Sequence, residues 1–142
     1  MEFDRDLALA VALHQDDAVP FDEEARRAFF SLQIGTLTAI AARRCEAMIC
    51  MDWQVAIMGD DGQPLKNAAG QASQPWRIYN SEFYKFRQVI SDSCAVDHTI
   101  GHSLRDAFMR YEQTVKSAAR NKKGKKTVRQ VLDEVGLFCD HL

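Results

Sequence analysis

A run of fifteen residues without a charged side chain, from Ala28 to Ala42, constrains the fold of this chain most. Two arginines flank the run on each side. As a helix at 1.5 Å per residue it would span about 22 Å, which is shorter than the roughly 30 Å hydrocarbon core of a bilayer. We therefore expect a helix buried inside the protein, and no membrane-spanning segment.

The helix that contains this run should begin after Asp22 and continue to about Met48. An aspartate can accept a hydrogen bond from the free backbone N–H groups of the first turn. Two glutamates follow it, as the positive end of a helix dipole favours. Three large apolar residues of the run are expected in the core: Phe29, Leu37 and Ile40.

Apolar residues that recur at three- and four-residue steps predict the other helices. We expect a short helix over residues 3–14, a third that starts at Asn80 or Ser81 and breaks at residues 91–93, and a last one after Thr127. The clearest apolar stripe predicts a fourth helix over Ala95–Arg120. Its polar side should carry two ion pairs: Asp106/Arg110 and Glu112/Lys116.

Residues 53–79 have two interpretations. The segments 55–58 and 76–79 could pair as a small β-hairpin, because turn-forming residues lie between them. An ordered loop is the alternative. Since the 142 residues include only seven glycines and three prolines, we expect a mainly α fold. It would be a single domain, residues 1–142, of four to five helices with a buried central helix.

Four cysteines bear on the cellular setting: Cys45, Cys50, Cys94 and Cys139. No two of them form a CxxC motif, and the acidic N-terminus lacks the basic start and apolar run of a signal peptide. We therefore expect a reducing, cytoplasmic setting with free thiols, rather than two disulfides.

The charges are separated along the chain although the net charge is only −2. The first 24 residues contain eight acids and one arginine. In residues 116–129, by contrast, every charged residue is a cation. The cations of this basic segment are Lys116, Arg120, Lys122, Lys123, Lys125, Lys126 and Arg129. Such a patch attracts an acidic protein surface or nucleic-acid phosphates. The alternative is a solvated turn that complements a helix dipole.

A second candidate surface is the segment 76–87, in which aromatic residues alternate with cations. Aromatic rings among cations can stack on bases or anchor a protein interface. Helical spacing places Phe83, Phe86 and Ile90 on an inward face, so many of these rings should belong to the core. Four residues of this aromatic segment are assigned as candidate binding residues: Trp76, Arg77, Tyr84 and Lys85.

Cys94, His98 and His102 are spaced by four residues and could share a metal ion, with Cys139 and His141 completing a tetrahedral site. The two histidines lack the intervening glutamate of a zinc protease. Gly101 should loosen the helix between them, and the spacing places them on a polar face. We therefore expect surface histidines, with no metal and no cofactor.

No catalytic signature is found in the sequence. A thiol or hydroxyl nucleophile with a base and an orienting group, a phosphate-binding loop and a calcium loop are all missing. We therefore expect a non-enzymatic, cytoplasmic accessory or regulatory protein that docks through its charged and aromatic surface on a larger protein or nucleoprotein target. Direct DNA or RNA binding through residues 116–129 is the alternative, and a metal-dependent enzyme is a third hypothesis.

Overall fold

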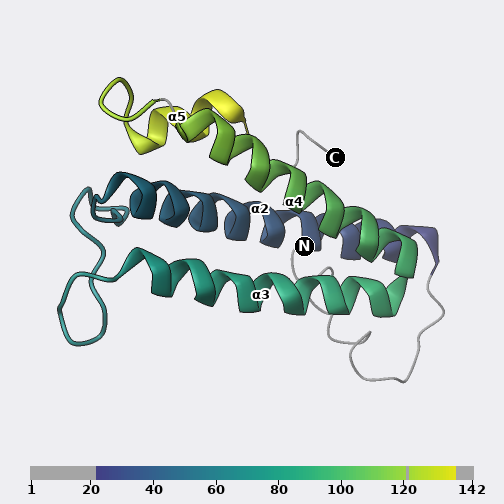
Figure 1. Cartoon of the computed structure of the whole chain (residues 1–142). Coiled ribbons are helices and arrows are strands. Elements are labelled where there is room, and N and C mark those ends of the chain that lie inside the picture. The colour runs from purple at the N-terminus through teal and green to yellow at the C-terminus, as the bar shows by residue number, and fades with distance from the viewer. Residues whose placement is uncertain (1–21, 121, 137–142) are drawn as a thin grey trace.

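The computed structural model describes residues 22–120 and 122–136. Four helices make up most of this part of the chain, and no strand occurs in it (Figure 1). The helices are α2 (Glu23–Trp53), α3 (Pro75–Val96), α4 (His98–Arg120) and α5 (Val128–Val135). The predicted mainly α fold is confirmed, while the helix predicted at residues 3–14 lies outside the described residues. None of the described helices combines the length and the apolar character needed to cross a bilayer.

Helix α2 begins where its sequence predicts and ends later. The Asp22 carboxylate accepts a hydrogen bond of 2.7 Å from the Ala25 N–H, so the predicted N-cap is confirmed. The helix continues five residues beyond Met48, because Trp53 is buried in the core and extends the packed face. It ends where Gln54 adopts a left-handed backbone conformation and its N–H bonds back to the last turn.

Helix α2 lies between α3 and α4 (Figure 1) and, like α4, packs against each of the other three described helices. Phe29, Leu37 and Ile40 are each at most 4% exposed, as predicted. The uncharged run 28–42 is covered over most of its positions, as expected of a buried central helix, but it has an exposed face. Within this run the exposed residues are Ser31, Gly35, Thr36 and Ala39. These residues are small or polar, so little apolar area meets the solvent.

Of the two interpretations of residues 53–79, the β-hairpin is not formed. Its second half, 76–79, belongs to the first turn of α3, which begins with Pro75. Proline is well suited to this position, because the first N–H of a helix has no partner within the helix. Residues 54–74 form a loop with two isolated bridges, Met58–Pro64 and Lys66–Ala72.

Helix α3 does not break at residues 91–93, contrary to prediction. The Ser93 hydroxyl donates a hydrogen bond of 2.8 Å to the Val89 carbonyl inside the helix, so the serine does not compete with the helical backbone. Asp97 alone then separates α3 from α4. Its N–H donates to the Ser93 carbonyl and its carboxylate accepts from the Thr99 N–H at 3.0 Å. The fourth helix therefore starts at His98 and not at Ala95.

All four helices share one apolar core. Phe86 of α3 stacks on Phe108 of α4 with ring centroids 4.0 Å apart, while Leu37 of α2 and Val131 of α5 are fully buried in the same cluster. Helix α5 starts at a capping box formed by Thr127 and Gln130, as expected from the Thr127 cap.

The ion pairs predicted on α4 are replaced by others. Glu112 is buried, and its carboxylate accepts a hydrogen bond of 2.7 Å from Arg44 of α2 instead of pairing with Lys116. Asp106 lies 3.4 Å from Arg105, its neighbour in sequence, rather than pairing with Arg110. Four-residue spacing allowed both predicted pairs, but helix packing turns Glu112 toward the core.

Candidate docking groove and histidine cluster

A groove of about 780 Å³ lies between the loop that follows α2 and the turn that precedes α5. It is at the end of the bundle where α2 ends and α4 leads into α5 (Figure 1). Its apolar lining consists mainly of Trp53, Val55, Met58, Val128 and Leu132. Val55 and Met58 are 43% and 44% exposed, so this end of the molecule presents apolar side chains to the solvent.

The loop wall of the groove is held in place by α2. The Ile57 side chain between Val55 and Met58 is only 1% exposed, so it anchors the segment. The Arg43 guanidinium donates a hydrogen bond of 3.1 Å to the Met58 carbonyl and lies 3.1 Å from the Glu46 carboxylate. These contacts fix the two exposed apolar side chains relative to the helix.

The opposite wall comes from the basic segment. Lys123, Lys126 and Arg129 line the groove, whereas its acidic lining residues are Glu46 and Asp60. Two of the three cations are partly neutralised by carboxylates of α5: Lys126 lies 2.8 Å from Glu134, and Arg129 lies 3.6 Å from Asp133. The hydrogen bond and charge of Lys126 lower the pKa of the Glu134 carboxyl.

The other cations of the basic segment lie at the same end of the bundle. Lys116 and Arg120 are exposed on the last turns of α4, and Lys125 is exposed in the turn beside the half-buried Lys122. Within residues 22–120 and 122–136, no ion pair joins any of these four to an acidic side chain. The charges of Lys116, Arg120 and Lys125 therefore face the solvent without an ion pair to the described part of the chain, while the charge of Lys122 adds to the lowering of the Glu134 pKa.

The aromatic segment forms a separate surface on α3. Trp76 and Tyr84 are 51% and 69% exposed, and Arg77 lies 5.1 Å above the Trp76 ring. Lys85 lies 2.9 Å from the Glu82 carboxylate. None of the four candidates of this segment lines the groove, and Arg77 lines a different cavity of about 470 Å³. The groove thus takes cations from the basic segment, and docking through a combined charged and aromatic surface stays a prediction.

Val55 and Met58 were missed as candidate binding residues. The sequence favoured segment 55–58 as one strand of a hairpin, whereas in the loop Val55 and Met58 are exposed before and after the buried Ile57. The sequence signal available for them was their position directly before a turn-forming segment, where apolar side chains are often left exposed.

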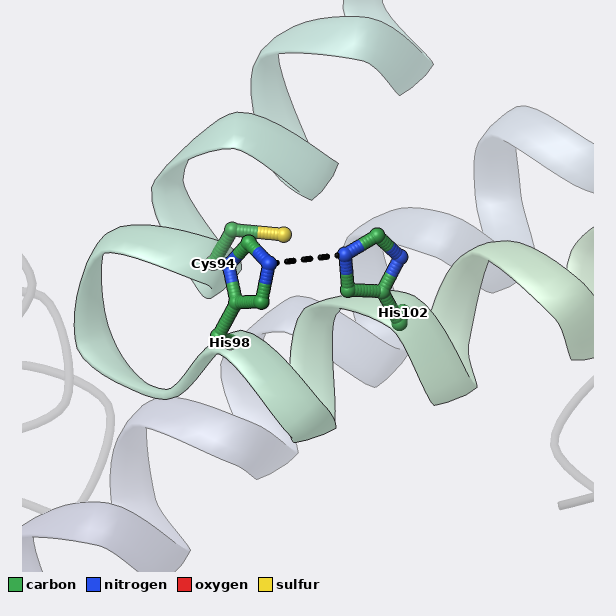
Figure 2. Close-up of side chains that lie close together, drawn as sticks. All are labelled: Cys94, His98 and His102. Carbon is green, nitrogen blue, oxygen red and sulfur yellow. Dashed lines mark hydrogen bonds between the residues drawn. The ribbon is translucent and has the colours of Figure 1, made fainter.

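The third candidate, the histidine cluster Cys94, His98 and His102, lies at the corner between α3 and α4 (Figure 2). The two histidine Nε2 atoms are 3.0 Å apart, and each residue offers a ligand atom within 4.8 Å of the other two. Cys94 belongs to α3 and the two histidines belong to α4, so the cluster joins two helices. Cys139 and His141 lie outside the described residues.

Gly101 has a different role from the one predicted. It is buried, and a Cβ added to it would lie 2.7 Å from the Cys94 backbone nitrogen and 2.9 Å from its Cα. Gly101 therefore allows the end of α3 to approach α4 closely, rather than loosening α4.

The described cysteines carry free thiols and differ in burial. Cys45 and Cys50 are buried, and burial raises the pKa of Cys45 strongly and that of Cys50 to about 11. Both therefore stay protonated near neutral pH and are poor nucleophiles. Cys94 is half-buried, and Cys139 lies outside the described residues.

Comparisons with protein-family models, curated proteins and solved structures give no match to this chain. A function must therefore be inferred from the groove, the basic segment and the histidine cluster themselves.

Proposed function

We propose that this chain is a non-enzymatic, cytoplasmic accessory protein that docks on a larger protein by holding an acidic segment with apolar side chains in the groove. The observation that carries the proposal is that the exposed apolar side chains Val55 and Met58 line the same groove as Lys123. Apolar side chains of the partner would remove Val55 and Met58 from water, and carboxylates of the partner would face the cations.

The lining of the groove favours a protein segment over a nucleic acid. Trp53 is the aromatic residue that lines it, and at 8% exposed its ring cannot stack on a base. Glu46 and Asp60 would also repel phosphates. A volume of about 780 Å³ falls in the range of pockets that enclose a drug-sized ligand, so the groove has room for a few side chains of a partner.

Direct DNA or RNA binding stays the second proposal, supported by the outer face of the basic segment. Lys116, Arg120 and Lys125 are exposed and have no ion pair with another described residue. Such cations are free to contact phosphates. This mode would use the surface beside the groove and not its apolar lining.

Selection of a displayed random-peptide library on the full-length chain tests the first proposal. We expect selected peptides to be enriched in Asp or Glu together with large apolar residues. Val55→Ser/Met58→Ser and Lys123→Glu/Lys126→Glu should each weaken these peptides by at least about tenfold, as loss of an interface anchor or of a facing charge does. The matched control is Arg87→Glu/Arg110→Glu, which makes the same charge change at exposed positions of α3 and α4.

Two results would refute the groove as the docking site. One is a selection without this enrichment, and the other is equal binding of the selected peptides to the groove variants and to wild type. Circular dichroism of each variant checks that the helices persist.

The second proposal is tested by salt-dependent retention of duplex DNA and single-stranded RNA. Phosphate contacts release counterions, so affinity should fall steeply with salt and vanish when Lys122, Lys123, Lys125 and Lys126 are changed to Glu. Peptide binding that relies on Val55 and Met58 should respond less to salt. Retention that is equal for wild type and the fourfold variant would remove the basic segment from nucleic-acid binding.

A further inference from the structure

Three side chains with metal-binding atoms meet where α3 turns into α4 (Figure 2). The Cys94 Sγ comes from the last turns of α3, and the Nε2 atoms of His98 and His102 come from the first turns of α4. Figure 2 shows the sulfur and the two rings pointing toward one space.

The spacing of these atoms is close to that of a tetrahedral metal site. Zn²⁺ binds sulfur at about 2.3 Å and imidazole nitrogen at about 2.0 Å, which places tetrahedral ligands roughly 3.3–3.6 Å from one another. The histidine nitrogens are 3.0 Å apart, and all three ligand atoms lie within 4.8 Å of one another. Small side-chain rotations therefore suffice to reach this geometry.

Two backbone features hold the ligands in place. Asp97 ends α3 and caps α4 with one residue, through bonds to the Ser93 carbonyl and the Thr99 N–H. Gly101 then leaves room for the Cys94 backbone against α4. A hydrogen bond between two accessible imidazoles adds little stability in water, and it does not explain why a thiol lies beside them.

We propose that Cys94, His98 and His102 bind a divalent transition-metal ion of the zinc class. One sulfur and two imidazole donors suit Zn²⁺, and the Cys94 thiol would release its proton to solvent as it binds. Three protein ligands leave one position for water or for a donor from another group. The expectation of no bound metal came from the missing glutamate, from Gly101 and from the polar helix face, and none of these takes into account that Cys94 approaches the histidines from α3.

The metal site is independent of the docking groove. None of its three ligands lines the groove, and the 23-residue helix α4 separates the two ends of the bundle by roughly 35 Å. Failure of either proposal therefore leaves the other intact.

The test uses the untagged, full-length chain after removal of metal with a chelator. Calorimetric titration with Zn²⁺ should give one ion per chain, and Co²⁺ should produce a thiolate-to-cobalt absorption band in the near ultraviolet. Cys94→Ser should abolish this band, and His98→Gln and His102→Gln should each weaken Zn²⁺ binding by at least about tenfold. Cys50→Ser is the matched control, because it removes a thiol outside the cluster and should leave both signals unchanged.

Zn²⁺ binding that is equal in wild type and in Cys94→Ser/His98→Gln/His102→Gln would overturn the proposal. Co²⁺ binding without the thiolate band would overturn it as well. His98 is exposed, so His98→Gln gives a decisive result even if a change at Cys94 disturbs the packing against Gly101.

Discussion

Arg44 and Glu112 meet inside the helix bundle, with the Arg44 Nε 2.7 Å from the Glu112 Oε1. The same guanidinium donates to the Tyr79 carbonyl at 2.7 Å and lies 3.6 Å from the centre of the Tyr79 ring. Because the three residues belong to α2, α3 and α4, one buried cation joins three helices. A surface ion pair contributes little by comparison, since water screens it.

Removing one member of this pair should destabilise the protein strongly. We expect Glu112→Gln to lower the free energy of unfolding by about 3–5 kcal/mol, because Arg44 would stay buried without its counter-charge. The double variant Arg44→Met/Glu112→Leu should lose less free energy of unfolding than the sum of the losses for Arg44→Met and Glu112→Leu alone. Urea denaturation measures all variants, and additive losses would show that the two side chains do not interact.

Leu37 tests the position of α2 in the core. It is fully buried, so Leu37→Ala should lower the free energy of unfolding by about 2–5 kcal/mol through lost apolar burial and a residual cavity. Ser31→Ala, on the exposed face of the same helix, is the control and should change it by less than about 0.5 kcal/mol. A loss below about 0.5 kcal/mol for Leu37→Ala would contradict the central position of α2.

Two glycines within helices should respond oppositely to alanine. Gly101→Ala should lower the free energy of unfolding by about 1–3 kcal/mol, because the new methyl group would overlap the Cys94 backbone. Gly35→Ala meets nothing within 4 Å and should raise it by about 0.5–1 kcal/mol through higher helix propensity. Thermal or urea unfolding of both variants measures these changes. Stabilisation by Gly101→Ala would contradict the close approach of α3 to α4.

Tyr111 should make the fold sensitive to alkaline pH. Its hydroxyl donates to the Gly136 carbonyl at 2.9 Å, and burial, with a smaller effect of Cys45, raises its pKa from 10.0 to about 12. The unfolded chain therefore loses this proton at a lower pH than the native protein, so stability is full below pH 10 and falls as the pH rises toward 12.

Urea unfolding at several alkaline pH values measures this loss. Tyr111→Phe removes the ionising hydroxyl, so its stability should fall less steeply with pH than that of wild type. Parallel curves for the two proteins would exclude a contribution from Tyr111.

Local features of the fold could be predicted from the sequence. The caps at Asp22 and Thr127 depend on hydrogen bonds within three residues, and both were identified correctly. The start of α3 was missed although Pro75 signals it, because the alternating residues 76–79 suggested a strand instead. Ser93 was expected to break that helix, and only the structure shows its hydroxyl bonded to the preceding turn.

Features that depend on helix packing could not be predicted. Spacing along one helix placed Glu112 on a polar face, and nothing in the sequence indicated that Arg44, 68 residues away, would lie against it. The histidine cluster illustrates the same limit. The three residues were identified as a group, but only the turn between two helices brings the thiol to the imidazoles.

The single-residue connection at Asp97 also determines where this chain can change in length. One residue inserted there would rotate α4 by about 100° and shift it by about 1.5 Å relative to α3. Leu104 would leave the core and both histidines would turn away from Cys94, so insertions at this position should be excluded. The loop of residues 54–74 does not fix the rotation of one helix relative to another in this way. Its exposed stretch from 66 to 72 can therefore gain or lose residues without moving a helix. Variation in length should therefore be confined to one end of the bundle, next to the docking groove.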